Sequence, residues 1–174
     1  MDMTQPVQDE TRARGRLLRS LTRELFQTEA SALRHCKREA ERLARTSAAA
    51  PLRAISRHAE DVLSALPDLM GPRGLPISAG GVAVGAMFSG ARDLIFDRLI
   101  RRERSYRGTM LGVRHGVDLM HLFEHLAGLA NDSELRTFCQ RWLAVRTPLV
   151  ERLERELCWF AEHPHSALQF TRTA

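Results

Sequence analysis

Apolar side chains recur at helical spacing through most of the chain. Over residues 10–45 they return every three or four positions, with arginine and glutamate between them. This is the pattern of an amphipathic helix. A short link at 46–50 leads to a second stripe over 52–66. Pro51 suits the first turn of that second helix, and Pro67 is expected to end it there or soon after.

The second half of the chain shows the same period twice more. One stripe runs over residues 91–130, and another follows the turn at 131–133 and continues to about Glu162, where Pro164 is expected to end it. Residues 67–90 are rich in glycine and proline but largely apolar, which predicts a long crossover lying on the other helices. We therefore predict an all-α fold, an antiparallel four-helix bundle with a long crossover between helices two and three.

Length and composition agree with one domain. A chain of 174 residues buries a sizeable core, and 44% hydrophobic with 27% charged residues argues against wholesale disorder. Aromatic residues make up only 6%, which favours aliphatic helices over a β-sandwich. We assign residues 11–162 to the bundle and expect flexible tails at 1–10 and 163–174.

The formal net charge is +5, and Lys37 is the only lysine. Two interpretations remain: a compositional preference for arginine, or an anionic partner such as nucleic acid or a lipid surface. Arg101, Arg104 and Arg107 form a ridge on the polar side of the predicted third helix. The ridge has few interleaved aromatic residues. A solvated face is therefore favoured over an anion-binding one.

The three cysteines, Cys36, Cys139 and Cys158, form no Cys-x-x-Cys pair. We expect free, buried thiols in a reducing cytoplasm. The N-terminal segment is polar and lacks the apolar stretch of a signal peptide, and no run of 18 apolar residues occurs. The sequence thus predicts a soluble, cytoplasmic protein without a transmembrane segment.

One stretch of the chain suggests a family. Residues 103–127, ERSYRGTMLGVRHGVDLMHLFEHLA, lead through NDSEL into the last helix. Together with the helix lengths and the crossover, this stretch resembles the ferritin-like four-helix superfamily, and more narrowly the small bacterial ferritin-like domains of unknown function. The resemblance spans residues 10–162. It implies a mid-bundle metal centre built from glutamates and Glu-x-x-His pairs.

Four polar side chains lie on the apolar stripes, one for each predicted helix. They are Glu29, His58, Glu103 and Glu156, which are the candidate ligands for iron or another divalent metal. No Glu-x-x-His occurs within the second or fourth predicted helix. The one such spacing in the sequence, Glu162 to His165, contains Pro164 and lies where the last helix is expected to end. The favoured interpretation is that arginines, such as Arg146 on the inward face of the last helix, pair with these acids. No resident cofactor is then expected.

A second polar cluster lies lower on the third helix. Asp118 and His121 have a spacing that permits metal ligation, but a solvated face is the favoured interpretation. No nucleophile with a matching base is apparent, and we assign no catalytic residue. The full cluster is His115, Asp118, His121, Glu124 and His125.

The functional hypothesis follows from these patterns. Gly108, Gly112 and Gly116 give the third helix a bare face. With the apolar crossover, this face favours a non-catalytic interaction or assembly module that forms a homo-oligomer or binds a protein partner. The first alternative is a metal-binding ferritin-like protein, and the second binds anionic surfaces or nucleic acid through the arginine ridge.

Overall fold

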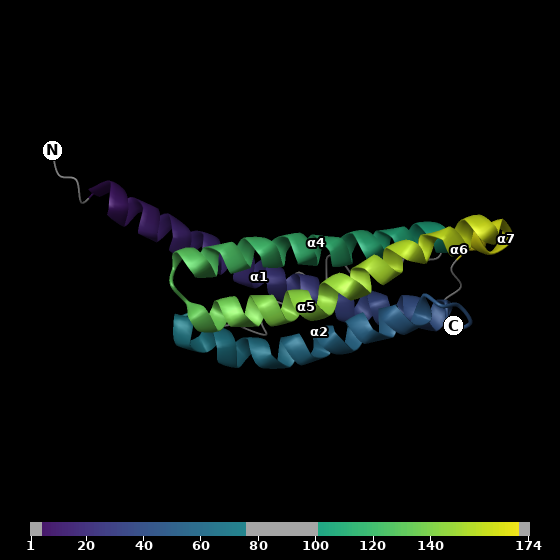
Figure 1. Ribbon diagram of the computed structural model, residues 1–174, viewed down its shortest axis with the longest axis horizontal. Coiled ribbons are helices and arrows are strands. Elements are labelled where there is room, and N and C mark those ends of the chain that lie inside the picture. Colours follow the sequence, from purple (N-terminus) through teal and green to yellow (C-terminus); the bar gives the residue numbers. More distant parts are fainter. Residues whose placement is uncertain (1–4, 76–100, 171–174) are drawn as a thin grey trace.

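The computed structural model describes residues 5–75 and 101–170, and side chains from residue 9 onward. Within these ranges the chain is all-α, as predicted, and has no strand beyond a single bridge between Arg101 and Phe170. Part of the predicted crossover and the start of the predicted third helix lie outside the described residues. The elements, shown in Figure 1, are α1 (Gln5–Arg42), α2 (Ala49–Met70), η1 (Gly71–Arg73), α4 (Arg102–Leu129), α5 (Ser133–Arg155), α6 (Leu157–Glu162) and α7 (Pro164–Leu168).

The helix ends depend on local chemistry. Helix α2 continues through Pro67 to Met70, so it stops soon after the proline, as predicted. Its last turn persists because Met70 is buried and the Gly71 N–H donates to the Pro67 carbonyl. The predicted fourth helix is divided, since α5 ends at Arg155 and α6 follows. After Pro164 the chain forms α7, where we predicted a flexible tail.

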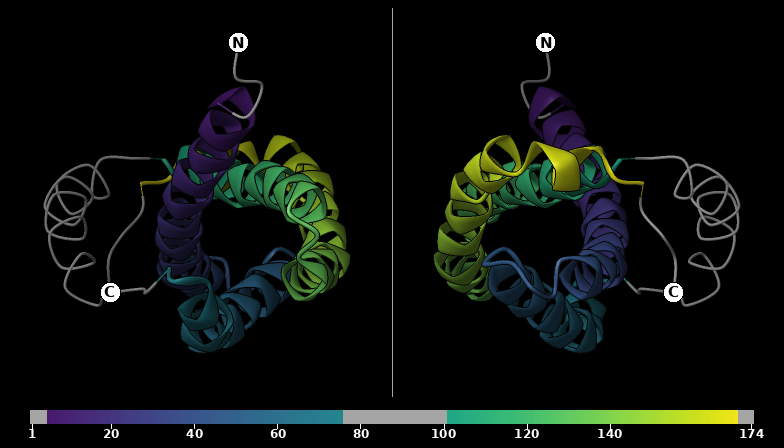
Figure 2. Two further views of the ribbon diagram at one scale, coloured as in Figure 1. Left: turned by 90° about the vertical axis from the view of Figure 1, so that its left-hand side faces the viewer. Right: turned by 90° about the vertical axis from the view of Figure 1, so that its right-hand side faces the viewer.

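The long helices α1, α2, α4 and α5 lie side by side around a common axis (Figure 2). Helix α1 packs against α2 and α4, and α5 packs against α4 and α2. The Ser56 hydroxyl of α2 donates to the Leu33 carbonyl of α1 at 3.0 Å. Near the end of α1, Arg42 donates to the Ser105 hydroxyl of α4 at 3.2 Å. These contacts show which parts of neighbouring helices lie side by side.

The apolar interior is divided into two clusters. The first contains Leu25, Leu66, Phe123 and Trp142, and the second contains Ile55, Tyr106, Leu153 and Phe160, among others. On each long helix, the residues of the first cluster are separated from those of the second by one stretch of sequence. On each long helix, a stretch that belongs to neither apolar cluster therefore lies between the two. No helix in the described ranges is long and apolar enough to cross a membrane.

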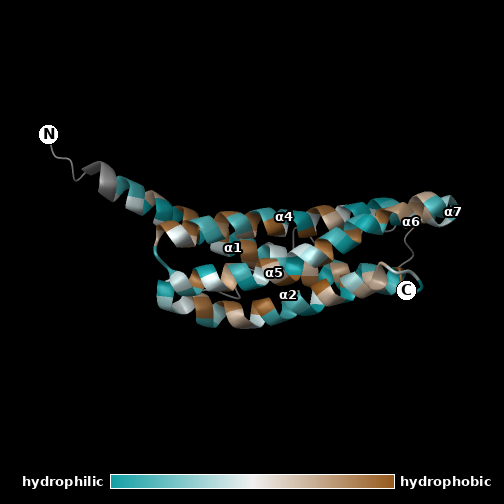
Figure 3. Ribbon diagram, in the orientation of Figure 1, coloured by the Kyte–Doolittle hydropathy of each residue, from teal (hydrophilic) through white to brown (hydrophobic). Residues whose placement is uncertain are grey.

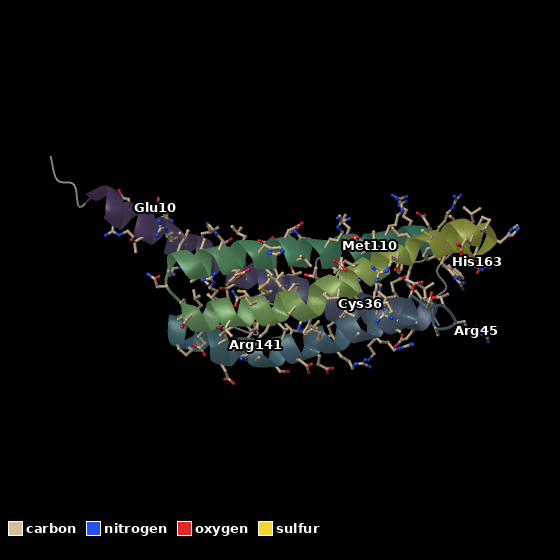
Figure 4. The ribbon with its side chains drawn as sticks, in the orientation of Figure 1. Glu10, Cys36, Arg45, Met110, Arg141 and His163 are labelled. Atoms are coloured by element: carbon tan, nitrogen blue, oxygen red, sulfur yellow. The ribbon has the colours of Figure 1, made fainter. Side chains whose placement is uncertain are left out.

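The first turns of α1 project beyond the other helices (Figure 1). They are mostly hydrophilic (Figure 3), and Glu10 marks them in Figure 4. Arg12 lies 4.0 Å from Asp9, and Arg14 lies 3.4 Å from Glu10. Such exposed pairs contribute only a few tenths of a kcal/mol each. Because α1 joins the buried core only from Leu21 onward, residues 9–20 are mostly exposed.

The cysteines differ in accessibility. All three thiols are free, but only Cys36 and Cys139 are buried, and Cys158 is exposed. The prediction of three buried thiols was therefore wrong at Cys158, because α6 turns that position outward. Burial raises the pKa of Cys36 to about 12, and that of Cys139 to about 12 as well. Figure 4 shows Cys36 among the helices.

An arginine clamp joins the end of α2 to the start of α5. Arg73 of η1 donates from Nε and Nη2 to the two carboxylate oxygens of Asp132, at 2.6 and 2.7 Å. Nη2 also lies 3.0 Å from Glu134, and Nη1 donates to the Leu69 carbonyl. Asp132 accepts the Leu135 N–H at 3.0 Å and so caps α5. The hydrogen bond from Arg73 lowers the pKa of Asp132.

Replacing Arg73 by alanine is expected to lower the free energy of unfolding by about 1–3 kcal/mol, because a bidentate charged pair is lost. Glu134→Ala is the matched control, and it should cost less than about 1 kcal/mol because that carboxylate is largely exposed. Urea unfolding followed by circular dichroism measures both. Equal costs for the two variants would contradict the clamp.

Candidate functional site

A polar layer crosses the molecule between the two apolar clusters. Glu29 of α1 is 0% exposed and Arg146 of α5 is 1% exposed, and His58 of α2 is half-buried beside them. Helix α4 contributes Gly116 to the same region, against Thr28 and Trp142. The layer therefore draws on each of the long helices.

Arg146 is the centre of this layer. Its Nη2 donates to Glu29 Oε2 at 2.7 Å, and its Nε donates to His58 Nδ1 at 3.2 Å. The guanidinium carbon lies 4.7 Å from the centre of the Trp142 ring, close enough for a cation–π contact. Trp142 Nε1 donates to the other carboxylate oxygen, Glu29 Oε1, at 3.1 Å. No buried side-chain nitrogen or oxygen within residues 9–75 and 101–170 lacks a hydrogen-bond partner.

The hydrogen bonds assign the protonation states. His58 accepts through Nδ1, so its ring is neutral with the proton on Nε2. Burial and the nearby Arg146 charge lower the pKa of His58 to about 4. Burial raises the pKa of Glu29, and the attraction and hydrogen bond of Arg146 oppose that rise. Both oxygens of Glu29 accept hydrogen bonds, so we assign an ionised carboxylate opposite a guanidinium that stays charged.

Gly116 makes room for this arrangement. A Cβ atom at that position would lie 3.2 Å from Thr28 Cγ2 and 3.6 Å from Trp142 Cη2. Gly108 and Gly112 have nothing within 4 Å of the same position. Within the predicted bare face, only Gly116 allows a close helix approach. There the Trp142 indole occupies the space that a side chain on α4 would fill.

The four predicted metal ligands do not come together. Glu29 and His58 meet at Arg146, whereas Glu103 pairs with Arg107 one turn along α4. Glu156 accepts a hydrogen bond from Ser47 at the α1–α2 link. No group of three or more histidine, cysteine, aspartate or glutamate side chains in the described part of the chain can hold a metal ion. The predicted alternative, an acid paired with Arg146, is confirmed at Glu29.

The lower cluster on α4 is spread over the surface. His115 lies 2.9 Å from Glu24 of α1, and Glu124 accepts a hydrogen bond from Gln140 of α5 at 2.9 Å. Asp118, His121 and His125 are exposed. Their one-turn spacing places them along one outer side of the helix without joining them. This is the solvated polar face that the sequence favoured.

A groove of about 930 Å³ lies between α1 and α4. It begins at the arginine ridge, where Arg104 is exposed and has no carboxylate partner among the described residues, whereas Arg107 pairs with Glu103. Hydroxyl groups, imidazole rings and bare backbone alternate along it. Its lining includes Thr28, Ser31 and His35 of α1 and Arg104, Ser105, Gly108, Leu111, Gly112 and His115 of α4.

These two features suit different roles. The layer at Arg146 is closed and fully hydrogen-bonded, so it orders the helices. The groove is open and mixes cations, hydroxyls and an exposed leucine. The sequence predicts the arginine ridge and the glycines but not the groove, because only the α1–α4 packing creates it.

Replacing Arg146 by methionine is expected to cost about 3–5 kcal/mol of stability, because Glu29 is left as a buried, unpaired charge. The double variant Glu29→Met with Arg146→Met should cost much less than the two single changes together. A double-mutant cycle by urea unfolding measures this coupling. Arg114 and Glu154, an exposed pair at 3.1 Å, form the control cycle, for which we expect less than about 1 kcal/mol. Additive costs at the buried pair would contradict the assignment.

Stability should also depend on His58 protonation. The pKa of His58 is about 4 in the folded chain, below the ordinary value of about 6.5 in the unfolded chain. The unfolded state therefore takes up the proton first, so this contribution is complete above about pH 6.5 and is lost as the pH falls toward 4. In His58→Gln the amide oxygen can still accept from Arg146 without titrating. The urea midpoint of this variant should fall less between pH 7 and pH 4 than that of the native chain, and equal decreases would contradict the assignment.

Comparison with known proteins assigns no role to this site. No family model, curated protein sequence or solved structure matches the chain. The resemblance to ferritin-like proteins therefore remains a hypothesis that rests on the sequence features that suggested it. What the site can do has to be judged from its own geometry.

Proposed function

We propose that this chain is an antiparallel four-helix bundle of the ferritin-like kind, and that it acts without catalysis as an interaction and assembly module. Contacts between elements distant in sequence support the topology. Arg42 near the end of α1 meets Ser105 near the start of α4, while Glu24, earlier in α1, meets His115 further along α4. Arg73, just after α2, contacts Asp132 at the start of α5. His58, earlier in α2, contacts Arg146 further along α5, so these two helices also run in opposite directions.

The observation that carries the proposal is the Arg146–Glu29 pair. In ferritin-like metal proteins, carboxylates and histidines at mid-bundle face a metal. Here the guanidinium of Arg146 stands between Glu29 and His58 and engages both of them. A guanidinium has no acceptor and no accessible deprotonated form, so it neither binds a cation nor transfers a proton. This leaves the outer surface as the working part of the molecule.

The groove along α1 and α4 is the best candidate for that working surface. Its rim carries Arg104 and Arg114, and Leu111 stands exposed beside the open backbone of Gly112. Protein surfaces bind through such mixtures of apolar and polar groups. A nucleic acid would gain from aromatic stacking, but Tyr106, the aromatic residue within the ridge, is buried with its hydroxyl bonded to the Leu153 carbonyl at 2.7 Å. The geometry therefore favours a protein partner.

Self-association is the measurable consequence. At about 100 μM, light scattering coupled to size-exclusion chromatography should give a mass above that of the 19.7 kDa chain, and the mass should fall on dilution. The physical reason is that apolar surface on α4 remains open in the single chain. A constant mass of one chain over the whole concentration range would contradict the assembly function.

A further inference from the structure

The outer side of α4 carries a repeat of residues that are exposed in the described part of the chain. Starting at Arg104 and Gly108, exposed residues follow at alternating steps of three and four positions. This is the spacing of the contact seam of a two-helix coiled coil. The residues that continue it are Leu111, His115, Asp118, Leu122, His125 and Leu129. We call the positions from Arg104 to Leu129 in this series the α4 seam.

The α4 seam lies opposite the core. The buried positions of α4, which include Val113, Met120 and Phe123, form the other side of the helix. Leu111 is 70% exposed, Leu122 is 44% exposed and Leu129 is 50% exposed. Three exposed leucines thus stand among polar positions on one face of α4.

The seam is complementary to itself when a second copy runs in the opposite direction. If Arg104 of one copy faces Leu129 of the other, every intermediate position meets another seam position. Leu111 then faces Leu122 of the second copy, and His115 faces Asp118, each contact occurring twice through the two-fold axis. Asp118 has no ion-pair or hydrogen-bond partner in the described part of the chain, so this register supplies one.

The charges at the two ends of the molecule support the same direction. The end that holds the start of α4 is rich in exposed arginine, including Arg101, Arg104 and Arg107. The end that holds the α4–α5 turn carries charges of both signs, as in the pair of Glu134 with Arg73. Parallel copies would place the arginine-rich start of α4 beside that of the other chain, whereas antiparallel copies keep the two apart.

The shape of the surface fits as well. Arg104, Gly108, Leu111 and His115, the first half of the seam, also line the groove between α1 and α4. In the antiparallel register, the second half of the partner's seam lies over this groove. The surface is open at Gly108, because no atom lies within 4 Å of the position of a Cβ atom there.

From these observations we infer that a second copy of this chain binds along the α4 seam, antiparallel, with Leu111 against Leu122 and His115 against Asp118. This inference rests on the proposed assembly function and names its partner and register. With few leucine contacts, the interface belongs to the small, reversible class.

Leu122→Glu tests the interface. It places a carboxylate in two leucine contacts of the dimer, yet its side chain is already part-exposed, so the fold should survive. We expect the mass measured by light scattering at about 100 μM to fall to that of one chain. Val145→Glu is the matched control, because Val145 is 46% exposed on α5 outside the seam, and it should keep the native mass. Thermal unfolding by circular dichroism verifies that both variants fold.

Cysteine cross-linking tests the direction. In a Cys158→Ser background, which removes the exposed native thiol, Gly108→Cys and His125→Cys are made as separate proteins. On mild oxidation the mixture should give a disulfide-linked pair of one of each. Parallel copies would instead link Gly108→Cys to itself, and that product would overturn the antiparallel register.

The outcomes separate the two proposals. If the native chain is a single copy at every concentration, the assembly function fails. If the native chain associates but Leu122→Glu leaves its mass unchanged, the assembly function stands and the α4 seam is not its interface. If Leu122→Glu alone dissociates the assembly and the mixed disulfide forms, both proposals are supported.

Discussion

The structure depends on one buried ion pair. Moving the charges of Arg146 and Glu29 out of water costs several kcal/mol for each ion, and their attraction offsets this only when every hydrogen bond is in place. Here the bonds come from three helices, because Glu29 lies on α1, His58 on α2 and Arg146 on α5. A sliding of α1 or α5 by one turn would leave a charge unpaired, and a sliding of α2 would leave the Nε donor of Arg146 without its acceptor. Apolar contacts alone tolerate such shifts, so the polar layer fixes the helix register.

The same layer explains the division of the interior. On one side lies the cluster around Phe123 and Trp142, and on the other the cluster around Tyr106 and Phe160. Trp142 joins the two kinds of surface, because its ring packs on Gly116 while its Nε1 donates to Glu29. Aromatic side chains with a polar end suit such boundaries. The helices are thus ordered from the centre, and Arg73 fastens one end through Asp132.

The guanidinium of Arg146 fills the centre of the molecule, and this is why the proposed function uses the outer surface. The side chains that the sequence predicts as metal ligands are engaged in hydrogen bonds and ion pairs within the chain. The exposed polar and apolar groups discussed above lie on α4. There the helix has one side in the core and the other open, with the groove along its first half. An amphipathic helix normally shows charged residues on its outer face. The leucines among them are the features that the fold itself does not explain.

The sequence by itself determined the helices, because apolar spacing near 3.6 residues and the proline positions are local properties. It also indicated that Arg146 is turned inward, since that residue stands on an apolar stripe. The sequence could not determine which residues of neighbouring helices lie side by side. Glu103 and Glu156 share the inward stripes with Glu29, yet they pair with Arg107 and Ser47 near the helix ends. Which polar residues meet depends on how far each helix slides along its neighbour. That distance is decided only in the folded chain, by the Arg146–Glu29 pair together with Trp142 packed on Gly116.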